Sequence, residues 1–148
     1  NMINTQLPNT TRVWIYQSQT ELSADLQATI QKDLNLFISN WAAHGNELHG
    51  DAFIVENYFI VLAVDESKVG ASGCSIDSST RFIKQLEKSY GISLLNRLYV
   101  LTELKRKKEI VHFADVKDNA NRFIYDPLVT TLGELRENWK VKVTDWNV

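Results

Sequence analysis

The alternation of hydrophobic and polar positions predicts a chain of mixed α/β structure. Runs rich in β-branched and aromatic residues predict strands at 12–17, 51–55, 58–65, 94–104 and 109–114. Apolar residues that recur at helical spacing predict two amphipathic helices, one with an apolar stripe from Leu26 to Trp41 and one with a stripe from Ile76 to Tyr90. The run 58–64 is apolar throughout, which is typical of a central strand covered on both faces.

Capping and turn residues set the limits of these elements. Ser23 is the predicted N-cap of the first helix, and Gly45 is predicted to end it. Gly91 is predicted to stop the second helix. Thr131 and Glu134 have the spacing of a capping box, which predicts a short third helix.

The predicted order of elements is β-α-β-β-α-β, followed by a further strand, a helix and a tail. This order predicts the α+β class with a ferredoxin-like βαββαβ core, an antiparallel sheet with two helices on one face. We expect one domain over 1–148, with a loose lead-in at 1–11 and a C-terminal extension at 115–148 packed on the core. Leu135, Trp139 and Trp146 are expected to cover the open face of the sheet.

The composition of the chain argues against nucleic-acid binding, membrane association and thiol-based metal binding. The 148 residues include 16 basic and 18 acidic side chains, for a formal net charge of −2, so a nucleic-acid-binding surface is not predicted. No apolar run is long enough to cross a bilayer, and we expect no membrane partner. The single cysteine excludes an intramolecular disulfide and a thiol-based metal site. We therefore predict a cytoplasmic protein with no cofactor and no metal.

The segment 69–78 concentrates the candidate chemistry, because it places the only cysteine between an apolar strand and a helix. Glycines allow a close backbone approach, and a helix N-terminus favours an anion. We predict a small cytoplasmic binding or regulatory domain that takes an anionic ligand here. The predicted ligand-binding residues are Gly70, Ser72, Gly73, Ser75 and Ser78.

Two other interpretations of this segment remain open. In one, the chain is an enzyme in which Cys74 is the nucleophile, His44 or His49 is the base and Asp77 supports it, since a thiol at a helix N-terminus is activated. In the other, the segment is only a capped helix start with a packed cysteine, and the chain is a structural domain that pairs with a partner or forms a homodimer.

A phosphate-binding loop is not predicted. The residues from Gly45 to Gly50 have the glycine spacing of a Walker A loop, but Asp51 and Ala52 follow where Lys and Ser or Thr are required. Without that lysine and hydroxyl, the segment lacks the groups that bind the β- and γ-phosphates and magnesium. We expect no nucleotide hydrolysis by this mechanism.

Three stretches together resemble a family of short uncharacterised bacterial proteins of about this length: 41–45 (WAAHG), 62–77 (LAVDESKVGASGCSID) and 128–139 (LVTTLGELRENW). The resemblance covers nearly the whole chain. Some members carry the label "ABC transporter ATPase", which the missing Walker lysine contradicts. The resemblance implies no established activity and no catalytic residues.

Overall fold

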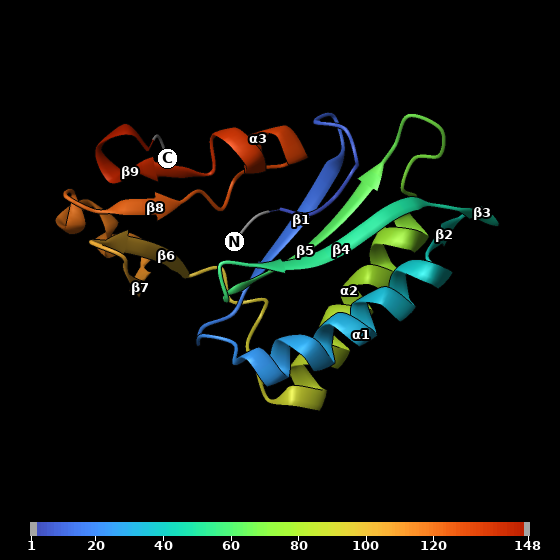
Figure 1. Ribbon diagram of the computed structural model, residues 1–148, viewed down its shortest axis with the longest axis horizontal. Helices are drawn as coiled ribbons and strands as arrows, with labels where there is room; N and C mark the ends of the chain where they lie inside the picture. Colours follow the sequence, from blue (N-terminus) through green and yellow to red (C-terminus); the bar gives the residue numbers. More distant parts are fainter. Residues whose placement is uncertain (1–2, 147–148) are drawn as a thin grey trace.

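The computed structural model of the chain describes residues 3–146. In this part of the chain, α-helices and short 3₁₀ helices accompany two antiparallel sheets and a small hairpin (Figure 1). The elements are, in order, β1 (Arg12–Gln17), α1 (Ala24–Asn40), β2 (Ala42–Ala43), β3 (Asn46–Glu47), β4 (His49–Val55), β5 (Phe59–Asp65), α2 (Gly73–Tyr90), β6 (Tyr99–Leu104), β7 (Lys107–His112), η1 (Phe113–Asn119), β8 (Phe123–Tyr125), α3 (Leu132–Glu137), β9 (Lys140–Lys142) and η2 (Val143–Asp145).

The first sheet has the strand order β1-β5-β4, with β5 antiparallel to both neighbours. The residues of β5 from Phe59 to Val64 are all buried, which confirms the predicted central strand. A tight turn joins β4 to β5, and Glu56 and Asn57 adopt the positive φ values of 56° and 62° that such a turn requires. The predicted hairpin is therefore confirmed.

Helices α1 and α2 lie side by side on one face of this sheet (Figure 1). The Ser23 side chain accepts a hydrogen bond from the backbone N–H of Leu26, and Gly91 ends α2 in the left-handed conformation, so both predicted boundaries are confirmed. The side chains that meet in this layer form the first core, among them Ile30, Leu34, Ile60, Leu62 and Ile83. Complete burial of one such side chain contributes about 1.5–3 kcal/mol.

The predicted end of α1 at Gly45 is wrong. The helix ends at Asn40, and the next residues form the β2–β3 hairpin, with His44 and Gly45 in its turn at φ 51° and 78°. Trp41 explains the early end, because its indole is buried and donates a 2.8 Å hydrogen bond to the carbonyl of Ser75 in α2. Burying this side chain against α2 takes the backbone out of the helix.

The α+β class with antiparallel sheets is confirmed, but the ferredoxin-like topology is not. In that topology the strand after α2 pairs with the free edge of β1, whereas β6 joins a second sheet of order β7-β6-β8-β9. Residues of the C-terminal segment occupy part of the β1 edge instead. The Val13 N–H donates to the Thr130 carbonyl, and the Leu132 N–H donates to the Thr11 carbonyl, each at 2.9 Å.

The second face of the first sheet packs against the C-terminal half of the chain. Leu135 and Trp139 join Phe59 and Val61 in this second core, as predicted. Trp146 does not, because it packs beside Val143 in a third, smaller core under the second sheet. The capping box of α3 is confirmed, since Thr131 and Glu134 bond to each other's backbone N–H groups.

In residues 3–146, no helix is both long and apolar enough to cross a membrane.

Candidate functional site

The predicted glycine segment forms a turn and the first turn of α2. Ser72 is the N-cap, and its side chain accepts a 3.1 Å hydrogen bond from the Ser75 N–H. Ser75 returns the bond, because its hydroxyl oxygen accepts from the Ser72 N–H at 2.7 Å. The backbone N–H groups of Ser72 and Ser75, two of the five predicted ligand-binding residues, therefore already have hydrogen-bond partners within the chain.

A carboxylate of the chain itself already lies against this turn. Glu66 accepts a 2.8 Å hydrogen bond from the Ala71 N–H, and a guanidinium nitrogen of Arg12 lies 3.8 Å from its other oxygen. An anionic ligand at this turn would therefore meet a resident negative charge beside Gly70.

The structure places the segment that contains His44 beside the segment that contains Cys74, but it shows no hydrogen bond between the two side chains in residues 3–146. The Trp41–Ser75 hydrogen bond holds the β2–β3 hairpin, which contains His44, beside the first turn of α2. Cys74 and Asp77 are exposed on that turn. Within residues 3–146, no hydrogen bond or ion pair joins Cys74 to Asp77 or to a histidine.

Metal-ligating side chains do not gather at this or any other place in the described residues, where no group of three His, Cys, Asp or Glu could hold an ion. Asp65 ends β5, and its pKa is lowered by hydrogen bonds from the backbone and side chain of Ser67. This carboxylate therefore has a local structural role, ordering the turn that follows the strand.

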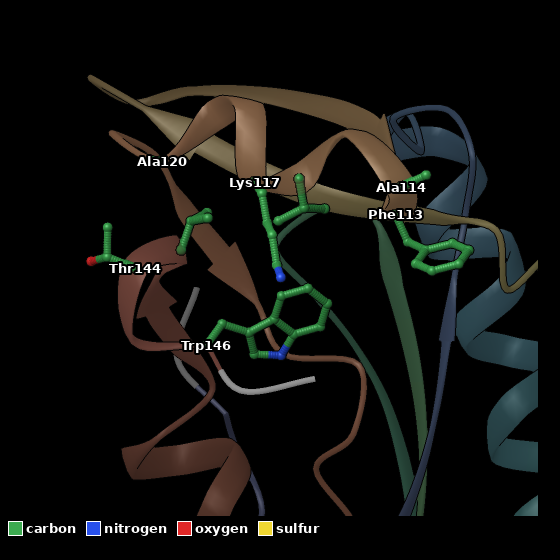
Figure 2. A pocket seen from close by; sticks show the side chains of 8 residues that line it. Phe113, Ala114, Lys117, Ala120, Thr144 and Trp146 are labelled. Carbon is green, nitrogen blue, oxygen red and sulfur yellow. The ribbon is translucent and has the colours of Figure 1, made fainter.

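A cavity of about 770 Å³ lies elsewhere, between η1 and η2 (Figure 2). The His112 ring caps η1 by accepting a 3.1 Å hydrogen bond from the Ala114 N–H. The Val143 N–H donates to the Arg122 carbonyl at 3.0 Å and so fixes η2 beside β8. The residues that line the cavity are Phe113, Ala114, Val116, Lys117, Ala120, Val143, Thr144 and Trp146.

Among the residues that the structure describes, Lys117 is the only charged one in the lining of this cavity. Its side chain points from η1 toward the Trp146 indole (Figure 2). The indole is itself fixed, because its N–H donates a 3.2 Å hydrogen bond to Asp126. Within the described part of the chain, Lys117 forms no ion pair, so its ammonium group is available to a ligand.

A second hollow, of about 520 Å³, is the groove between α1 and α2. Phe37 and Phe82 stack in it with ring centroids 4.4 Å apart, and Leu36 on α1 is 66 % exposed. Of the predicted site residues, Ser78 lines this groove. The carboxylate that lines the groove belongs to Asp33, and it already accepts a hydrogen bond from the Tyr90 hydroxyl.

A charged cluster joins the two sheets; its members are Glu56, Glu103, Lys108, Tyr125 and Lys140. The Tyr125 hydroxyl oxygen lies 2.9 Å from a Glu103 oxygen and 3.2 Å from a Glu56 oxygen. Lys108 lies within 3.7 Å of both carboxylates, and Lys140 pairs with Glu103. Burial and the two carboxylates raise the pKa of Tyr125, so its phenol keeps its proton and donates it.

Sequence reasoning missed the η1–η2 cavity. Its lining comes from two segments about 25 residues apart that show no periodicity, and η1 lies where the helical pattern fades. The one available signal was Phe113, a large aromatic residue near the end of the strand predicted at 109–114, which in the structure opens η1 and is 48 % exposed.

Comparison of the chain with models of known protein families, with curated proteins and with solved structures gives no match.

Proposed function

We propose that this chain is a small-molecule-binding domain and that the cavity between η1 and η2 is its binding site. The observation that carries the proposal is a concave site of about 770 Å³ whose lining is mainly apolar and contains one cation without an ion pair in residues 3–146. Binding sites for small molecules have this size and this combination of apolar walls with few polar groups.

Two other hollows in the described part of the chain fit this role less well. In the α1–α2 groove, the charged group Asp33 is already bonded to Tyr90. A third hollow, of about 410 Å³, is lined by Lys140 and Arg136, whose N–H groups already bond to other residues of the chain. Lys140 pairs with Glu103, and Arg136 donates to Asn9 and to the carbonyls of Thr5 and Leu7.

Amide NMR spectra of the labelled full chain test the proposal, with phenylnaphthylamine as a neutral aromatic probe. We expect the probe to shift signals of residues 113–120 and 143–146. Ala114→Trp should abolish these shifts, because the exposed Ala114 lines the cavity and an indole there would fill it. Ala42→Trp is the matched control, since Ala42 is an exposed alanine in the β2–β3 hairpin.

The proposal fails if the probe shifts no signals in the two segments, or if Ala114→Trp binds it as well as the original chain does. The same spectra recorded with inorganic phosphate test the predicted anion site, which requires shifts at residues 70–78. The resemblance to short bacterial proteins stays a prediction and names no activity that competes with either site.

The enzyme hypothesis, which uses Cys74, also stays a prediction and has its own test. If His44 or His49 activates the thiol with support from Asp77, then His44→Gln, His49→Gln or Asp77→Asn should slow its alkylation by iodoacetamide at neutral pH. His112→Gln is the control, because His112 caps η1. Equal alkylation rates in all variants would exclude the pairing.

A further inference from the structure

We infer that the η1–η2 cavity selects an amphipathic oxyanion: a small molecule with a flat apolar body and a single carboxylate or sulfonate group. This inference rests on the proposed function and names the class of ligand that the site takes.

The walls of the cavity define the apolar part of the ligand. Val116 and Val143, which are 1 % and 7 % exposed, belong to the third core and form a rigid apolar base. Phe113 is 48 % exposed although it is a large aromatic residue, and Trp146 presents its indole to the same space (Figure 2). Aromatic walls favour a planar ligand body, because stacked and edge-on ring contacts add to the burial of apolar area.

The charge of the cavity defines the polar part. The Lys117 ammonium lies beside apolar surface and has no counter-ion within residues 3–146. Asp115 and Asp118 lie in the same turn, but neither lines the cavity and neither forms an ion pair with Lys117. A bound oxyanion would supply the missing partner, whereas a cationic ligand would be repelled.

The geometry points to a free small molecule rather than to a peptide. The lining comes from two short segments at 113–120 and 143–146, and none of the described lining residues belongs to a strand. The orientation of the Trp146 ring is fixed by Asp126, so the position of the aromatic wall is set before a ligand arrives. Preorganised walls of this kind lower the entropic cost of binding.

Two fluorescent probes that share one aromatic body test the inference: anilinonaphthalene sulfonate, an anion, and phenylnaphthylamine, its neutral counterpart. We expect Lys117→Met to weaken binding of the sulfonate by about tenfold, the loss of one charge-assisted contact. Binding of the neutral probe should change by less than about twofold, because the methionine keeps the apolar stem of the lysine. Lys84→Met, on the exposed face of α2, is the matched control.

The outcomes separate the inference from the proposed function. If Lys117→Met leaves both probes unaffected while Phe113→Ala weakens both, the site binds small molecules but does not select an anion, and the inference is overturned. If neither probe binds, or if Phe113→Ala and Ala114→Trp leave both affinities unchanged, the proposed function fails as well. Added sodium chloride should weaken the sulfonate and not the neutral probe.

Discussion

The two faces of the first sheet are covered in different ways. On one face, α1 and α2 are each continuous in sequence, and the first core needs only residues from 16 to 94. On the other face, the second core combines Val13 of β1 with side chains as distant as Trp139. The first face is therefore encoded by local periodicity, whereas the second depends on contacts between remote segments. The candidate binding cavity lies in the C-terminal half of the chain, which also covers the second face.

The largest expected effects come from truncating one leucine on each face. Leu34 and Leu132 are both fully buried, the first under the helical layer and the second in the second core. We expect Leu34→Ala and Leu132→Ala each to lower the free energy of unfolding by about 2–5 kcal/mol. Because β5 contributes side chains to both cores, both variants should show one cooperative transition in urea, followed by circular dichroism and tryptophan fluorescence.

Leu36→Ala is the control for these variants, because Leu36 is 66 % exposed, and a change within about 0.5 kcal/mol is expected. Two separate transitions in Leu132→Ala would show instead that the faces unfold independently.

A smaller effect is expected from the charged cluster around Glu103, which has no counterpart among residues 3–146 on the helix-covered face. Burial alone would raise the pKa of Glu103, but the hydrogen bonds from Lys140 and Tyr125 and the charge of Lys108 lower it. A carboxylate whose folded-state pKa is lowered stabilises the protein above its ordinary pKa of 4.5 and loses that contribution as the pH falls through the folded value.

Glu103→Gln should therefore destabilise the chain by about 1–3 kcal/mol near neutral pH, because the side chain is only 12 % exposed and leaves its partners unpaired. The difference between variant and original chain should shrink as the pH is lowered below 4.5, measured as urea midpoints across an acid series. Parallel curves would contradict the assignment, and Glu47→Gln on an exposed hairpin is the control.

The smallest expected effects come from the two capping boxes, one at the start of α2 on the helix-covered face and one at the start of α3 on the opposite face. Ser72→Ala and Thr131→Ala each remove a side-chain acceptor for a helix N–H group, a loss of about 1 kcal/mol. Hydrogen exchange should separate them: Ser72→Ala should increase exchange in α2, and Thr131→Ala should do so in α3. If Thr131→Ala instead increases exchange throughout α2, the two regions are more tightly coupled than their separate cores indicate.

The accuracy of the sequence-based expectations follows the same division. The cap at Ser23, the turn at Glu56 and Asn57, the stop at Gly91 and the capping box at Thr131 were all predictable, because each depends on a few neighbouring residues. The end of α1 was not, because Trp41 leaves the helix to reach a carbonyl 34 positions further along the chain.

The course of β6 was not predictable for a similar reason. Its own residues fit a strand in either sheet, and the choice depends on Thr130 and Leu132, which bond to the edge of β1. The strand β8 spans only the three residues Phe123–Tyr125, a run too short to predict a strand from alternation. The predicted residues around Cys74 were placed correctly on a helix start, but a cavity between two irregular turns leaves no periodic signal.

The hydrogen bonds that tie the beginning of the chain to α3 have a consequence for biosynthesis. Arg136 donates to the carbonyl of Thr5, across 131 positions, and the edge of β1 is bonded by residues 130–132. While the ribosome is still making the C-terminal part, β1 therefore presents an unpaired edge, which can pair with another nascent chain.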